Sequence, residues 1–152
     1  MVTAGQCWHW FDRPAAASEA ARLLKPDGAL VIAHFDWIPL PGNLAEATER
    51  LIEKHNPDWT MGGGTGMPRE WLADVAMARF SGIETFSYDE QTPYSHQAWR
   101  GRIRASAGVG ASLPADAVEK FDGELDNLLE TRFPEDPLGV LHRCFALVCQ
   151  FT

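Results

Sequence analysis

One short apolar run limits the possible folds of this chain most strongly. Residues Ala29 to Ala33 read Ala-Leu-Val-Ile-Ala without a polar side chain, a pattern typical of a strand that is buried on both faces of a parallel sheet. The preceding segment, Arg13 to Leu24, has apolar residues at helical spacing, with Asp12 as a candidate N-cap and a turn at residues 25–28. A helix that leads into a buried strand predicts an α/β fold.

Helical and extended patterns alternate along the rest of the chain. Helices are predicted over residues 43–55, 68–79, 95–107 and 114–131, and strands over residues 83–88 and 140–151. Residues 1–4 are a further, short strand candidate. No linker or internal repeat interrupts the pattern, so we expect a single domain over residues 1–152.

Composition and charge narrow the range of partners. The formal net charge is 13 − 21 = −8, and this acidic balance argues against a nucleic-acid partner, whose phosphates require clustered lysines and arginines. The longest apolar run is far too short to cross a membrane. Cys7, Cys144 and Cys149 lack the spacing of a disulfide framework or a metal site, so we expect a reducing cytoplasm, no metal and a small-molecule or protein partner.

Two segments of the sequence resemble class I S-adenosylmethionine-dependent methyltransferases. Residues 2–12 hold the small residues Ala-Gly, a Gln and a His-Trp pair, and residues 22–32 hold a Leu-Lys-Pro-Asp-Gly turn before the apolar run. The pattern is most similar to the type 11 and trans-aconitate methyltransferase branch. Asp27 stands where that branch usually has glycine, and aspartate tolerates left-handed turn geometry. The resemblance continues more loosely through Trp59, the glycine loop Gly62–Gly66, and residues 80–83 and 94–99 to the C-terminal strand.

This resemblance implies a truncated Rossmann-like sheet. It would consist of a remnant of the family's fourth strand, followed by strands five, six and seven with flanking helices. The last strand would run antiparallel between the fifth and the sixth. The family's glycine-rich loop and ribose-binding carboxylate have no counterpart in the sequence, and Gly62–Gly66 does not follow a strand pattern. We therefore expect an incomplete domain, the C-terminal half, whose binding of S-adenosylmethionine is doubtful.

The resemblance also implies part of a methyl-transfer site after the first strand. Ala4, Gly5 and Gln6 would contact the methionine part of S-adenosylmethionine, and His9 and Trp10 would line the methyl-transfer pocket. His9 is the catalytic candidate, and Trp10 would contact the cofactor. A capping role is the alternative for His9, and packing in the core is the alternative for Trp10.

A second group of candidates follows the apolar run. His34, Asp36 and Trp37 come directly after the predicted strand, and ligands of open parallel sheets lie beyond the carboxyl ends of the strands. These residues are therefore candidates for the substrate side, with His34 as a general base. The alternative is that His34 is a structural histidine, hydrogen-bonded at the end of the strand.

A third group lies near the predicted helix 95–107. Arg100 and Arg104 are four residues apart and share a helical face. They form either a solvated basic face or a clamp for a substrate carboxylate. Tyr94 and His96 lie beside them in the sequence and would complete a substrate pocket.

Two functions are compatible with these patterns. The first is methyl transfer to a small molecule, carried out only when a cofactor-binding half is present, so that the chain alone is inactive. The alternative is a non-catalytic methyltransferase-like module that dimerises or binds a partner. Because the missing strands would leave an open sheet edge, we expect a homodimer through that edge.

Overall fold

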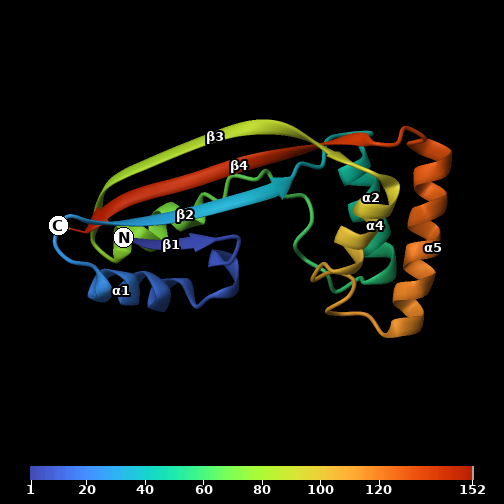
Figure 1. Cartoon of the computed structure of the whole chain (residues 1–152). Coiled ribbons are helices and arrows are strands. Elements are labelled where there is room, and N and C mark those ends of the chain that lie inside the picture. Colours follow the sequence, from blue (N-terminus) through green and yellow to red (C-terminus); the bar gives the residue numbers. More distant parts are fainter. Residues whose placement is uncertain (152) are drawn as a thin grey trace. The chain divides into compact units, whose positions relative to one another are not determined.

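The computed structural model describes residues 1–151 and has a mixed α/β fold, which confirms the predicted class (Figure 1). Its elements are β1 (Val2–Gly5), the 3-10 turn η1 (Trp8–Trp10), α1 (Arg13–Leu23), β2 (Gly28–Trp37), α2 (Leu44–His55), α3 (Glu70–Met77), β3 (Phe80–Tyr94), α4 (His96–Arg104), α5 (Ala115–Arg132) and β4 (Leu138–Phe151). The strands β2 and β3 extend beyond the predicted ranges 29–33 and 83–88. Residues 34–37 continue β2, and residues 80–82 and 89–94 extend β3 at its two ends. These flanking residues mix polar and apolar side chains without the pattern that predicted the strands.

The helix starts follow from local capping. Asp12 accepts a hydrogen bond from the backbone N–H of Ala15 at 3.2 Å, with Pro14 in the first turn of α1. Asn43 accepts a hydrogen bond from Glu46 N at 2.9 Å. These contacts satisfy backbone donors that the helix itself leaves unpaired. The predicted N-caps of α1 and α2 are therefore confirmed.

The four strands form one sheet in the order β1-β2-β4-β3. The strands β1 and β2 are parallel, with Val2 opposite Leu30 and Gly5 opposite Ala33. Hydrogen bonds of 2.9 Å from Asp27 N to Phe151 O and from Ile38 N to Leu141 O show that β4 runs antiparallel to β2. The predicted position of the last strand between its two neighbours is thus confirmed, and β1 lies at an edge of the sheet. Asp27 has a φ of 63°, the left-handed geometry expected at that turn.

The chain divides into two compact units. The first comprises residues 1–36, residues 65–90 and the C-terminal residues from 142, and the second comprises residues 37–64 and 91–141. None of the helices within residues 1–151 combines the length and apolar character that a bilayer span requires.

In the first unit, α1 and α3 pack with the sheet in one hydrophobic core. Leu30 and Ile32 of β2 are fully buried in this core, together with Trp71 and Val75 of α3 and Leu147 of β4. Hydrophobic burial of this kind contributes about 1.5–3 kcal/mol for each large side chain.

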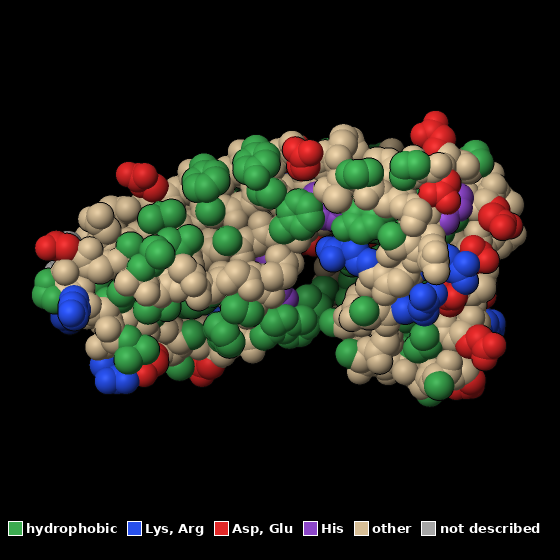
Figure 2. All heavy atoms as spheres, in the orientation of Figure 1, with side chains coloured by type: hydrophobic (Ala, Val, Ile, Leu, Met, Phe, Trp, Pro, Cys, Tyr) green, Lys and Arg blue, Asp and Glu red, His purple; other side chains and the backbone are tan. Residues whose placement is uncertain are grey.

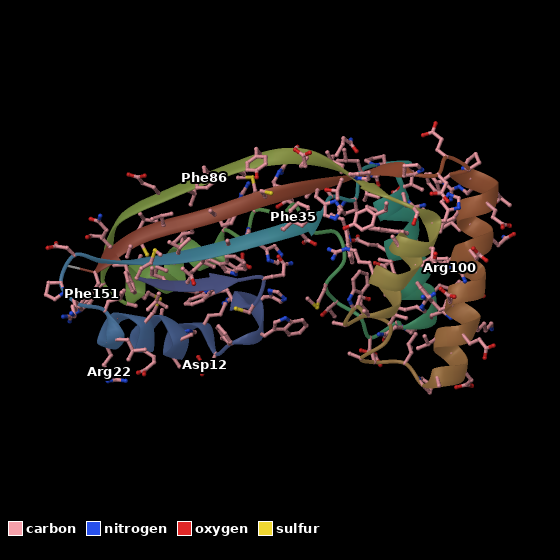
Figure 3. The ribbon with its side chains drawn as sticks, viewed as in Figure 1. Asp12, Arg22, Phe35, Phe86, Arg100 and Phe151 are labelled. Carbon is pink, nitrogen blue, oxygen red and sulfur yellow. The ribbon has the colours of Figure 1, made fainter. Side chains whose placement is uncertain are left out.

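The prediction that residues 29–33 are buried on both faces is wrong. Val31 and Ala33 alternate with the buried residues and are only partly covered. Phe86 and Tyr88 of β3 are 58% and 55% exposed, and Phe86 is labelled in Figure 3. Figure 2 shows apolar side chains gathered over the region of this strand. Within residues 1–151, the helices of the first unit cover the face of Leu30 and Ile32.

In the second unit, α2, α4 and α5 enclose a separate core. Its fully buried side chains are Trp99 and Ile103 of α4, Phe121 and Leu125 of α5, and Ile52 of α2. The Nε1 atom of Trp99 donates a hydrogen bond to Thr48 Oγ1 at 3.1 Å, so the polar atom of this buried ring is satisfied.

Candidate active site at the carboxyl ends of β1 and β2

The parallel pairing of β1 and β2 brings the residues that follow β1 close to the last residues of β2. His34, Asp36 and Trp37 were predicted to come after the second strand, but they are its last part. Gln6, directly after β1, has a φ of 57°, and its N–H donates to Ala33 O at 2.9 Å. Its Oε1 accepts a hydrogen bond from Phe35 N at 2.7 Å. Gln6 thus ties the end of β1 to β2, because both its backbone and its side chain bond to that strand.

Two histidines meet at this edge. His9, on η1, and His34, on β2, lie with 5.3 Å between their ring centroids. His34 Nε2 is 3.5 Å from Asp36 Oδ2, and the His34 ring packs edge to face against Trp71 at 5.4 Å. The predicted candidates His9, His34 and Asp36 are therefore neighbours in space, although two separate segments carry them.

The environment of His9 favours the neutral imidazole. Burial lowers the pKa of His9, and the neighbouring His34 lowers it further, whereas the Asp36 carboxylate opposes the shift. The Nδ1 atoms of His9 and His34 are both buried and have no hydrogen-bond partner among residues 1–151. A neutral imidazole with an unpaired ring nitrogen can accept a proton from a hydroxyl or amine.

The predicted cofactor contacts fall into different environments. Ala4 is buried in the core of the first unit, so its side chain is not available to a ligand. Gly5 is exposed, and a Cβ at this position would meet nothing within 4 Å. Trp10 is 59% exposed, with its ring 4.6 Å from that of His9. Gly5 and Gln6 also border a cavity of about 370 Å³, together with His34, Phe35, Tyr88 and Cys144.

These residues fit only part of S-adenosylmethionine. The open space at Gly5 would admit a ligand close to the backbone. However, no residue that lines the cavity is a carboxylate, and a carboxylate is the group that accepts hydrogen bonds from ribose hydroxyls. The glycines of residues 62–66 lie between α2 and α3 and follow no strand, as predicted. The described residues therefore do not fit the whole cofactor.

Trp37 and Tyr94 belong to the second unit and pack around Trp99. The ring centroids of Trp37 and Tyr94 lie 5.6 and 5.2 Å from that of Trp99. Trp37 Nε1 also donates to Glu49 Oε1 at 2.8 Å. His96 Nε2 lies 2.9 Å from the carbonyl oxygens of both Phe133 and Glu135, which anchors the start of α4.

Arg100 and Arg104 make ion pairs with α5. Arg100 contacts Asp122 at 2.5 Å and Asp126 at 2.6 Å, and Arg104 contacts Asp122 at 2.6 Å. Arg100, labelled in Figure 3, thus bridges α4 and α5, and Figure 2 shows basic and acidic side chains side by side in this region. These guanidinium groups lower the pKa of Asp122, Arg100 more than Arg104. A substrate carboxylate at this position would have to compete with two aspartates.

Three residues that support these groups were missed in the sequence. Asp74 of α3 accepts a hydrogen bond from Trp8 Nε1 at 3.2 Å and pairs with Arg13 Nε at 3.0 Å, which fixes the turn that carries His9. The signal for Asp74 is a carboxylate between Trp71 and Val75 on a buried helix face. Glu49 of α2 accepts hydrogen bonds from Trp37 and, at 2.8 Å, from Gly63 N. Trp71 packs against His34. In the sequence, its helical spacing indicates only a buried helix position and not a contact with His34.

The order and directions of the strands match those of solved structures. The chain has the Rossmann-like fold of class I S-adenosylmethionine-dependent methyltransferases. It is similar to the YcgJ protein of Bacillus subtilis, with a TM-score of 0.52, 19% identity, and coverage of 97% of this chain and 62% of that one. It is equally similar to a protein of Anabaena variabilis assigned as a methyltransferase of antibiotic biosynthesis, with a TM-score of 0.52, 17% identity, and coverage of 95% and 64%.

A curated relative agrees with this class. The chain is 26% identical over 133 residues to an uncharacterized methyltransferase of Schizosaccharomyces pombe, and the match covers 86% of this chain and 49% of that protein. The predicted resemblance to class I methyltransferases is thereby confirmed. The chain spans about half the length of this relative. No protein-family model matches the chain.

Proposed function

We propose that this chain is the substrate-side half of an S-adenosylmethionine-dependent methyltransferase that acts on a small molecule. The proposal rests on the cluster of His9, His34 and Asp36 at the shared carboxyl edge of β1 and β2. The methyltransferase name of the fission-yeast relative supports the same reaction type. We place this reaction in the cytoplasm, where free cysteines stay reduced.

In this proposal, the chain binds and orients the methyl acceptor and takes up its proton. Asp36 orients His34, whose free Nδ1 faces no protein partner among the described residues. Burial lowers the pKa of His9 and so favours its neutral form, which would be a second proton acceptor. Trp10 would shield the reacting groups from water, which matters because the substitution proceeds best when reactants are held in line and desolvated.

The chain alone should bind the cofactor weakly. We expect calorimetry with S-adenosylmethionine or S-adenosylhomocysteine to show no binding tighter than about 100 μM, equivalent to about −5.5 kcal/mol. Tighter binding would contradict the view that a separate cofactor-binding half is needed. The same titration of a polypeptide extended upstream of Met1 should restore binding and methyl transfer.

The restored enzyme allows the site to be tested. His34→Gln should reduce kcat without changing affinity for the cofactor, because it removes a proton acceptor and keeps the side-chain size similar. His55→Gln, at the end of α2 and outside the candidate site, is the matched control. Equal activity of the His34 variant and the parent would show that His34 takes no part in proton transfer.

We propose a carboxylate acceptor because Arg100 and Arg104 form a guanidinium pair on one face of α4. In the restored enzyme, Arg100→Ala should raise KM for a carboxylate acceptor without affecting cofactor affinity. Unchanged kinetics would assign Arg100 solely to the ion pairs with Asp122 and Asp126.

A second candidate function is a non-catalytic module that forms a homodimer. It is favoured by the exposed aromatic side chains of Phe86 and Tyr88 and by the edge position of β1, since exposed edges and apolar patches promote association. Sedimentation velocity should then show a dimer. Thr3→Pro, which removes a donor from the edge strand, should dissociate an edge-paired dimer, and a monomeric parent would exclude this function.

A further inference from the structure

A groove lies between α2 and α5 in the second unit, and none of the candidate site residues lines it. The two helices run in opposite directions (Figure 1). Glu124 of α5 forms an ion pair with Lys54 of α2 at 2.5 Å, and its other carboxylate oxygen lies 3.4 Å from His55 Nε2. The groove has a volume of about 800 Å³, which is comparable to that of a binding site for a sizeable ligand.

Small and apolar residues line one part of this groove, which we call its floor. Ala47 and Leu51 contribute from α2, and Gly123 and Leu128 contribute from α5. A Cβ at Gly123 would meet nothing within 4 Å, so the space above this glycine is open. The α5 stretch from Lys120 to Arg132 is about 18 Å long at 1.5 Å per residue, which matches about three turns of another helix.

Basic side chains line both sides of the groove. Arg50 and Lys54 come from α2, and Lys120 and Arg132 come from α5, whereas Glu124 is the single carboxylate in the lining. Glu124 already pairs with Lys54, and Arg50 pairs with Glu46, which lies outside the lining. Lys120 and Arg132 make no ion pair within residues 1–151. This concentration of cations stands out on a chain of net charge −8.

We propose that the groove between α2 and α5 binds an amphipathic helix of a partner protein whose apolar face is flanked by acidic residues. Apolar side chains of that helix would fill the floor over Gly123, and its carboxylates would pair with Lys120 and Arg132. Helix-in-groove recognition uses this combination of an apolar stripe and charged flanks. Charge complementarity selects an acidic partner helix over a basic one.

Two synthetic peptides test this proposal on the full chain. Both are capped 16-residue helices with leucines at positions 3, 7, 10 and 14. One carries glutamates beside the leucines, and the other carries lysines at the same positions. Fluorescence anisotropy should show binding of the acidic peptide at least tenfold tighter than that of the basic peptide, and added salt should weaken it. Equal binding of the two peptides, or no binding of the acidic one, would overturn the proposal.

Matched variants locate the binding. Gly123→Leu fills the open floor and should weaken binding of the acidic peptide at least tenfold, with the fold checked by circular dichroism. The pair Lys120→Glu and Arg132→Glu should weaken it similarly, whereas Lys25→Glu, outside the groove, should not. Unchanged binding by Gly123→Leu would overturn the proposal. Self-association of the chain that is abolished by Gly123→Leu would also overturn the proposal, because the groove would then bind a second copy of this chain.

Discussion

The imidazole rings of His9 and His34 lie edge to face with 5.3 Å between their centroids. Neither ring nitrogen Nδ1 has a hydrogen-bond partner within residues 1–151. The pair holds two buried nitrogen atoms without partners close together, and this arrangement costs stability when the His9 ring becomes charged.

This pairing predicts a loss of stability in mild acid. The pKa of His9 is lowered in the folded chain, whereas an unfolded histidine titrates at about 6.5. The unfolded state therefore binds more protons once the pH falls below that value, and the free energy of unfolding decreases until the pH passes the folded pKa. Urea denaturation at pH 7.5, 6.5 and 5.5 should show this decrease, and His9→Gln should make it shallower. If the free energy of unfolding depended on pH equally in the parent chain and in His9→Gln, the lowered pKa of His9 would be contradicted.

Cys149 should be the least reactive of the three thiols. Burial raises its pKa to about 11, so only about one thiol in a thousand is ionised at pH 8. Cys7 and Cys144 are partly exposed and should be alkylated first by iodoacetamide, as peptide mass spectrometry can determine. In denaturant, all three cysteines should react equally. Early labelling of Cys149 in the folded chain would contradict the burial of its thiol.

Gly110 and Gly123 should respond in opposite directions to alanine. A Cβ at Gly110 would lie 2.1 Å from the backbone oxygen of Arg104, and such crowding typically costs about 1–3 kcal/mol. At Gly123, in the middle of α5, a Cβ meets nothing within 4 Å, and the gain in helix propensity is about 0.8–1 kcal/mol. Thermal denaturation of both variants tests the pair, and a stabilised Gly110→Ala would refute the close approach.

The ion pairs of Arg100 should contribute more to stability than that of Arg50. Arg100 contacts two aspartates and is largely covered, so Arg100→Ala should cost about 1–2 kcal/mol. Arg50 is 73% exposed in its pair with Glu46, and Arg50→Ala should cost under about 0.5 kcal/mol. Chemical denaturation compares the two, and equal losses would mean that the α4–α5 pairs are no stronger than a surface contact.

Local chemistry explains why much of the fold could be predicted. Asp12 and Asn43 cap the helices that their sequences indicate, and the apolar run at residues 29–33 forms a strand in the expected place. The partial exposure of Val31 and Ala33 could not be predicted from the strand alone. It depends on which face of the sheet is covered by α1 and α3, which are other segments of the chain.

The candidate site was partly predictable for a similar reason. His34 and Asp36 come after the apolar run in the sequence, and they lie in the last part of β2, just beyond its parallel pairing with β1. The Trp8–Asp74 hydrogen bond, by contrast, joins residues 66 positions apart, and nothing near either residue indicates the other. Arg100 and Arg104 share a helical face as predicted, but their partner Asp122 lies on the next helix.

The division of the chain into two compact units has a practical consequence. Each unit is assembled from non-adjacent segments, with the chain passing from one to the other after residues 36, 64, 90 and 141. A stop codon or a protease cut at any single point therefore cannot release either unit intact. Isolating one of them would require the genetic splicing of distant segments.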